Sequence, residues 1–125
     1  MTAAPRPKYL NLFEIRQPVP AVVSILHRVS GALLFLFAWA LPWALQTLLQ
    51  SPAGFDRVVS LLDHWLVKLL ATSLLWAFLH HFFAGVRFLL LDLHVGVGLA
   101  SARASSWAVL ALSLLLTAAI GVALW

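Results

Sequence analysis

The last 19 residues of the chain, WAVLALSLLLTAAIGVALW from Trp107 to Trp125, carry no charge and have a tryptophan at each end. An apolar run of about 20 residues can cross the ~30 Å hydrocarbon core of a bilayer as a helix, and tryptophan is enriched at both membrane surfaces. Ser113, Thr117 and Gly121 recur at every fourth position within it, a stripe of small side chains that allows close approach of another helix. The stretch therefore predicts a transmembrane helix packed against a neighbour.

A second apolar run covers residues 29–49 and follows the helix-start pattern Pro18–Val19–Pro20. We therefore expect a helix over about 20–50. Pro42 lies inside it and should kink it, because proline removes one backbone hydrogen bond.

A third apolar run covers residues 64–91. Between it and the first helix, residues 51–54 read as a turn and residues 55–63 as a short interfacial stretch. The run predicts a helix over about 62–92.

The ends of the chain complete the expected layout. Residues 93–106, with two glycines and several small side chains, are interpreted as a loop before the last helix at about 105–125. Residues 1–19 are polar and proline-rich and are expected to form an arm outside the membrane. The fold class predicted is an all-α membrane protein with three transmembrane helices.

Composition supports a single membrane domain over residues 1–125. Of the 125 residues, 63% are hydrophobic and only 10% are charged, whereas soluble domains carry about 25% charged residues. There is no cysteine, which excludes disulfides, iron–sulfur ligation and thiol catalysis within this chain. The net charge of +4 comes from scattered basic residues beside apolar runs, a pattern of membrane orientation rather than nucleic-acid binding.

The basic residues predict the orientation. The N-terminal arm, the start of the first helix and the second loop with its flank hold six of them: Arg6, Lys8, Arg16, Arg28, Arg87 and Arg103. The first loop and its flank hold two, Arg57 and Lys68. Because cytoplasmic loops carry the excess of lysine and arginine, the N-terminus is expected in the cytoplasm and the C-terminus outside.

Polar side chains gather at the cytoplasmic end of two antiparallel helices. Ser24, Arg28 and Gly31 follow i, i+4, i+7 spacing and share a helix face, with His27 at its edge. Ionisable groups at membrane depth are costly, so each is a functional hypothesis. A site between the first two helices, in the cytoplasmic half of the membrane, is expected.

The second helix contributes a pair of histidines to this site. His81, Gly85 and Asp92 lie within about 40° of one another at 100° per residue, whereas His80 belongs to a different face, close in phase to Arg87. Gly85 should leave an empty place one turn from His81, where a flat macrocycle could fit, which favours haem ligation. The alternative for any single membrane histidine is a plain interhelical hydrogen bond, and Arg87 could simply extend to the headgroups.

Two segments resemble signatures of the cytochrome b membrane subunit of succinate dehydrogenase. Residues 24–31, SILHRVSG, resemble S-x-x-H-R-x-S/T-G, and residues 81–87, HFFAGVR, followed by Asp92, resemble H-x-x-x-G-x-R-H-x-x-x-D. Arg6-Pro7 and Asn11-Leu12 also fit, and the resemblance covers essentially the whole chain. It implies half of a helical bundle completed by a sister membrane subunit, with iron–sulfur and flavoprotein subunits in the cytoplasm.

The resemblance also implies roles for individual residues. His81 would be the axial ligand of a haem b shared with the sister subunit. His27 and Arg28 would contact the haem propionates, and Ser24 and Arg28 would line the site of ubiquinone, the substrate. No residue of this chain would be catalytic for succinate. Phe88 stands where the family has a histidine, which puts one propionate or proton contact in doubt.

The expected function is therefore a haem- and quinone-binding anchor of a succinate:quinone oxidoreductase in a bacterial inner membrane. His80 is a competing ligand, although only His81 has the H-x-x-x-G spacing. Three alternatives remain: the anchor of a quinol:fumarate reductase, a haem-free anchor or assembly protein, and a small transporter. The transporter is disfavoured because no inverted repeat or pair of broken helices is apparent.

Overall fold

The computed structural model describes residues 16–125, so most of the predicted arm at residues 1–19 lies outside the described residues. The described part is helical and contains five helices: α1 (Val19–Phe37), α2 (Ala40–Gln50), α3 (Pro52–Asp63), α4 (Trp65–Asp92) and α5 (Leu99–Leu124). Three spans within it are long and apolar enough to cross a membrane: Val19–Gln50, Trp65–Asp92 and Leu99–Leu124. The predicted fold class, an all-α membrane protein with three spanning helices, is confirmed.

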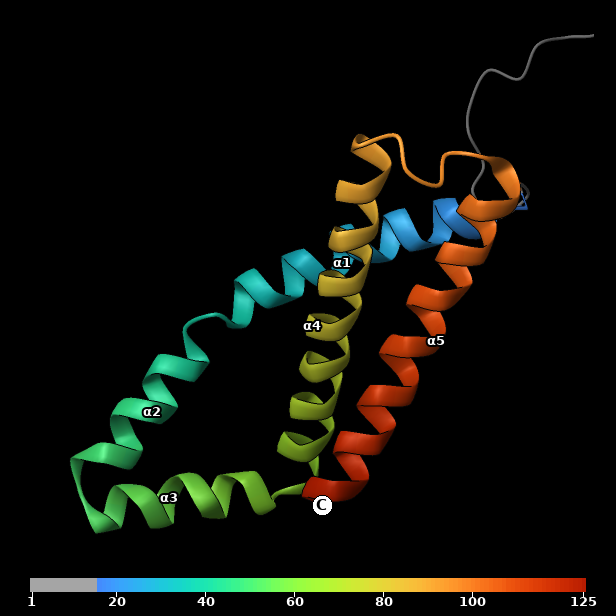
Figure 1. Cartoon of the computed structure of the whole chain (residues 1–125). Coiled ribbons are helices and arrows are strands. Elements are labelled where there is room, and N and C mark those ends of the chain that lie inside the picture. Colours follow the sequence, from blue (N-terminus) through green and yellow to red (C-terminus); the bar gives the residue numbers. More distant parts are fainter. Residues whose placement is uncertain (1–15) are drawn as a thin grey trace, which may run out of the picture.

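The first span is broken into α1 and α2 at Ala38 and Trp39. Pro42 has no N–H, so the carbonyl of Ala38 lacks its usual helical donor. In the same turn the Ala38 N–H donates to the carbonyl of Phe35 at 3.3 Å, three residues back. The bend predicted from Pro42 is therefore present, one turn before the proline, and Figure 1 shows the change of direction between α1 and α2.

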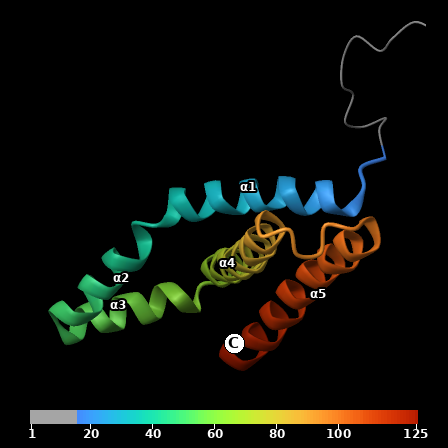
Figure 2. The same cartoon turned by 45° about the horizontal axis from the view of Figure 1, so that its top comes forward.

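The segment predicted as a turn and an interfacial stretch forms a short helix of its own, α3. Ser51 caps it by accepting a hydrogen bond from the Gly54 N–H at 3.1 Å, and Pro52 occupies its first turn. The helix is interrupted at His64, whose side chain caps α4 by accepting a hydrogen bond from the Leu66 N–H at 3.3 Å. As a result, α4 begins at Trp65 rather than near residue 62, and α3 runs across its start (Figures 1 and 2).

The last helix begins earlier than predicted. We expected a loop over 93–106 and a helix from about 105, but α5 starts at Leu99 and only residues 93–98 connect it to α4. The serines of this segment suit a helix because their hydroxyls bond back to it: Ser105 and Ser106 donate to the carbonyl of Ala102 at 3.2 and 2.7 Å. The small side chains of this segment were therefore insufficient evidence for a loop.

Helices α1 and α5 both pack against α4, and the interior is small. Its apolar centre joins Val23 of α1, Ala84 of α4 and Val109 of α5. On α5 the small-residue stripe faces inward as predicted: Ser113 and Thr117 are buried, and Gly121 lies near Thr72 of α4. Most large apolar side chains of the described residues are exposed, which fits a chain surrounded by lipid or by other membrane subunits.

The chain ends confirm the antiparallel threading. Figure 1 shows the start of α1 at the same end as the α4–α5 connection, and the C-terminus at the opposite end, beside the start of α4. There Lys68 lies 5.0 Å from the ring centre of Trp125 and pairs with Asp63 at 3.5 Å. Lys68 is thus held by neighbouring groups at the membrane boundary. The end that holds the predicted site is the other one.

Candidate functional site

The structure brings His27 of α1 and His81 of α4 into direct contact. Their rings are stacked, with centroids 4.1 Å apart and planes 7° from parallel. Nδ1 of His81 lies 3.0 Å from the backbone carbonyl oxygen of His27 and 3.3 Å from Oγ of Ser30. The contact between the two helices predicted from antiparallel threading is therefore present, and it is made by the predicted residues.

The hydrogen bond of His81 fixes its tautomer. A carbonyl oxygen can only accept, so the 3.0 Å contact places the proton on Nδ1. In the neutral ring Nε2 then keeps its lone pair, and it has no hydrogen-bond partner within residues 16–125. A histidine that binds a metal commonly has this arrangement, with one nitrogen held by a carbonyl and the other available.

Two glycines create the room for these rings, but not in the predicted way. A Cβ on Gly31 would lie 2.8 Å from Cε1 of His81, so the absent side chain of Gly31 is what accommodates His81. A Cβ on Gly85 would lie 3.6 Å from Nε2 of His27. The predicted empty place between Gly85 and His81 is not found, because the imidazole of His27 lies beside Gly85.

His80 has a different environment from its neighbour. It is fully buried, together with Ala77, Ala84 and Arg87 along one face of α4, which agrees with the predicted phase. Its ring stacks on Trp76 at 5.2 Å. Among the described residues, neither of its ring nitrogens has a hydrogen-bond partner.

Ser24 and Arg28 lie on α1 beside the histidine pair. Ser24 is half-buried and Arg28 is exposed. Within residues 16–125, neither side chain makes a hydrogen bond or an ion pair, and neither lines the pockets between α2, α3 and α4 or between α4 and α5. Both groups are therefore without a side-chain partner among the described residues.

Two residues acquire roles that the sequence did not assign. Phe88, the departure from the family signature, packs its ring edge-on against His27, with centroids 5.2 Å apart. Arg87, for which contact with the headgroups was the alternative interpretation, is buried instead: Nε donates to Oγ of Ser105 at 3.0 Å and Nη2 to the carbonyl of Ala102 at 3.3 Å. The phase of Arg87 with His80 was the signal that could have placed it inside.

Comparison with known proteins agrees with this arrangement. A family profile described as "Succinate dehydrogenase/Fumarate reductase transmembrane subunit" matches residues 2–120. A succinate dehydrogenase cytochrome b556 subunit from Coxiella burnetii is 35% identical over 124 residues, 98% of each chain. Its counterpart from Paracoccus denitrificans is 32% identical over 111 residues, 89% of this chain and 85% of the relative.

The match covers the first two spans and most of the third, and it includes residues 24–31 and 81–87, the two segments that meet at the histidine pair. The chain thus belongs to the family of succinate dehydrogenase/fumarate reductase transmembrane subunits, as an anchor of the cytochrome b type.

Proposed function

We propose that this chain is the membrane-anchoring, haem b- and quinone-binding subunit of a succinate:quinone oxidoreductase, which passes electrons from an iron–sulfur subunit to ubiquinone in the respiratory chain and the tricarboxylic acid cycle. The observation that carries the proposal is the His27–His81 contact, where both signature segments meet and one imidazole nitrogen is left available. The relatives named as cytochrome b556 subunits support haem as the cofactor.

His81 fits the axial ligand better than His80 does. Its ring is half-buried and its Nδ1 is anchored, so Nε2 can meet an iron from outside the three helices. His80 is fully enclosed by its own chain, and a macrocycle could not reach it without separating the helices. A haem supplies four ligands of its own, so one histidine from this chain and one from a sister subunit would complete the coordination of the iron.

A cation and a hydrogen-bond donor near the ligand suit the carboxylates of haem. In the proposal Arg28 and His27 hold the propionates, since charge-assisted hydrogen bonds are strongest where water is scarce. Haem b, when bound, would take up and return one electron at a time, with its axial ligands setting the potential. Phe88 replaces a polar contact in this region with a ring that fixes the imidazole of His27.

The quinone site in this proposal uses the outer side of α1. Arg28 holds and polarises one quinone oxygen, and Ser24 donates a hydrogen bond to the quinone. Their spacing of four residues places both on one face, and their lack of partners within the described residues leaves these donors free. Protons reach the quinone through water or a neighbouring chain, because no carboxylate of residues 16–125 pairs with Arg28.

The exposed apolar surface of the chain calls for partners within the membrane. The chain leaves most of its large apolar side chains exposed within the described part, which a sister membrane subunit and lipid would cover. An iron–sulfur subunit and a flavoprotein subunit would bind in the cytoplasm and carry the succinate chemistry. The six-to-two distribution of basic residues supports an N-terminus in the cytoplasm of a bacterial inner membrane.

The nearest alternative is the anchor of a quinol:fumarate reductase, which the family description includes. Such a complex would use the same haem and quinone residues, but electrons would pass from the quinol to fumarate. In a haem-free anchor, the second alternative, the bond of His81 to the His27 carbonyl would serve only to join α1 and α4; the relatives named as cytochrome b556 subunits favour haem instead.

Arg28→Leu tests the quinone role. In the assembled complex we expect a loss of roughly tenfold or more in quinone-dependent succinate oxidation, because a charge-assisted hydrogen bond is removed. Oxidation of succinate with a soluble artificial acceptor should be retained, since the flavin chemistry lies elsewhere. Both rates are measured on the same preparation, with haem content recorded.

Arg57→Leu is the matched control, because Arg57 is an exposed arginine on α3, at the opposite end of the molecule. It should leave both rates unchanged. If Arg28→Leu lowers both rates together while assembly and haem stay normal, Arg28 is not a quinone residue. If it lowers neither, Arg28 only contacts headgroups and the proposed role of α1 fails.

A further inference from the structure

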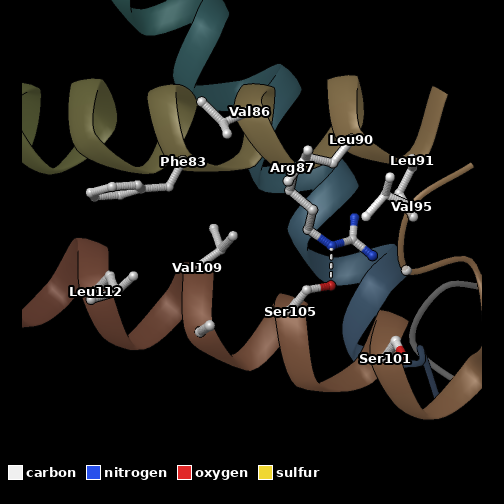
Figure 3. A pocket seen from close by; sticks show the side chains of 12 residues that line it. Phe83, Val86, Arg87, Leu90, Leu91, Val95, Ser101, Ser105, Val109 and Leu112 are labelled. Carbon is white, nitrogen blue, oxygen red and sulfur yellow. Dashed lines mark hydrogen bonds between the residues drawn. The ribbon is translucent and has the colours of Figure 1, made fainter. Parts of the chain in front are cut away.

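A pocket of about 310 Å³ opens between α4 and α5, away from the histidine pair. Figure 3 shows Arg87 and Ser105 near its middle, with Phe83 and Leu112 on one side and Leu91, Val95 and Ser101 on the other. Arg87 is its one charged lining residue. The pocket thus has a single cation in a lining that is otherwise mostly apolar.

Arg87 is only 6% exposed, and its partners within the described residues are neutral. Nε and Nη2 donate to Ser105 and to the carbonyl of Ala102, whereas Nη1 has no partner among residues 16–125. No carboxylate in that range lies within ion-pair distance of it. A buried cation without a counter-ion is costly, and among the described residues the guanidinium meets only these neutral acceptors and the ring of Phe88, 5.4 Å away.

Arg87 lies near the end of α4, on the side of the α4–α5 connection. It lies five residues before the end of α4 at Asp92, or about 7.5 Å along the axis at 1.5 Å per residue. From there the pocket continues along Val86 and Val109 toward Phe83 and Leu112, deeper in the membrane. On the other side of Arg87, Ser101 lines the pocket together with Leu91 and Val95 and supplies a further hydroxyl.

We propose that this pocket binds one anionic phospholipid, whose phosphate contacts Arg87 and whose acyl chain lies between α4 and α5. Basic pockets between transmembrane helices on the cytoplasmic side are a known way of recognising such headgroups. A zwitterionic lipid fits less well, because its own cation would approach a site that already carries an uncompensated positive charge. The lipid site is separate from the proposed haem and quinone residues.

Native mass spectrometry of the detergent-purified complex tests this. The complex is titrated with phosphatidylglycerol and, separately, with phosphatidylcholine. We expect a preference for phosphatidylglycerol of roughly tenfold at one site, and its loss in Arg87→Gln, as removal of a charge-assisted contact implies. Arg103→Gln is the matched control, because Arg103 is an exposed arginine near the start of α5 that does not line the pocket; it should keep the preference.

Ala108→Phe is a second variant that leaves Arg87 in place. Ala108 is an exposed residue that lines the pocket, so a phenyl ring there fills the space without disturbing the buried interface. We expect it to abolish the selective site as well. Equal phosphatidylglycerol binding by the wild type and Arg87→Gln would overturn the proposal. An Ala108→Phe complex that keeps its selective lipid would also overturn it. Loss of the sister subunit from that variant, with lipid binding unchanged, would show that a protein chain rather than a lipid occupies the pocket.

Discussion

The two interfaces that α4 makes use polar side chains in opposite ways. Against α5, hydroxyls bond to their own helix: Ser113 to the carbonyl of Leu110 at 3.0 Å, and Thr117 to that of Ser113 at 2.7 Å. Against α1, His81 bonds across the interface to the carbonyl of His27. Apart from Arg87, which donates across to Ser105 and Ala102 near the α4–α5 connection, the hydroxyls of the first interface are satisfied within their own helix, whereas the second interface depends on both helices.

The difference separates packing from function. A hydroxyl satisfied by its own helix adds little beyond its small volume, which lets two helices approach. Imidazoles stacked across an interface, one with an available nitrogen, are an expensive way to pack helices in lipid. We therefore expect substitutions at the α1–α4 interface to affect haem, and those at the α4–α5 interface to affect mainly stability.

The largest expected effect is that of His81→Ala compared with His80→Ala. The first should remove the b-type absorption band of the reduced complex, because the anchored imidazole is lost. The second should keep most of it, because His80 is enclosed by its own chain and bonds to nothing within residues 16–125. Visible spectra of both variants, normalised to protein, provide the measurement.

His80→Ala also leaves a cavity in the interior, so reduced yield of that variant is expected. The spectra are therefore compared per assembled complex. The opposite order, with haem retained in His81→Ala and lost in His80→Ala, would contradict the ligand assignment and the division between the two interfaces.

Much of the site could be predicted from the sequence because helical phase and antiparallel threading are simple rules. Threading placed His27 against His81, and helical phase separated His80 from His81; the roles expected of Ser24 and Arg28 stay predictions. The partner of each glycine could not be predicted, because it depends on the rotation of α1 against α4. That rotation places Gly31 against His81 and Gly85 against His27.

Local bonding explains the other misses. The start of α5 at Leu99 depends on serine hydroxyls that bond to the carbonyl of Ala102, and a serine-rich segment reads equally well as a loop. Arg87 could not be assigned to the interior from charge alone, since long cations at helix ends usually extend to water. Its burial depends on Ser105 lying opposite, which needs the actual course of α5.

An intermediate effect is expected for Gly31→Ala compared with Gly121→Ala. The added methyl at position 31 would stand 2.8 Å from the ring of His81, whereas at position 121 the nearest atom is Cγ2 of Thr72 at 3.9 Å. Overpacking of this kind costs about 1–3 kcal/mol. Gly31→Ala should lower haem content or shift the band, and Gly121→Ala should leave the spectrum unchanged.

Both glycines lie on spanning helices and receive the same substitution, so differences in helix propensity cancel. Haem content per complex is the measurement. Equal haem loss in the two variants would show that close packing in general, rather than the contact with His81, controls the cofactor.

The smallest expected effect is that of Ser30→Ala compared with Ser113→Ala. Both serines are fully buried, and both donate to a carbonyl three residues earlier in their own helix. Only Ser30 also lies within 3.3 Å of Nδ1 of His81. Loss of a single hydrogen bond costs about 1 kcal/mol, so each variant should lower the temperature of thermal inactivation by a few degrees at most. The haem should nevertheless distinguish them, because Nδ1 keeps the carbonyl of His27 but loses its second contact in Ser30→Ala alone. We therefore expect a shifted or broadened haem band in Ser30→Ala and an unchanged one in Ser113→Ala. An equal spectral change in both would mean that the α4–α5 interface reaches the ligand as directly as the α1–α4 interface does.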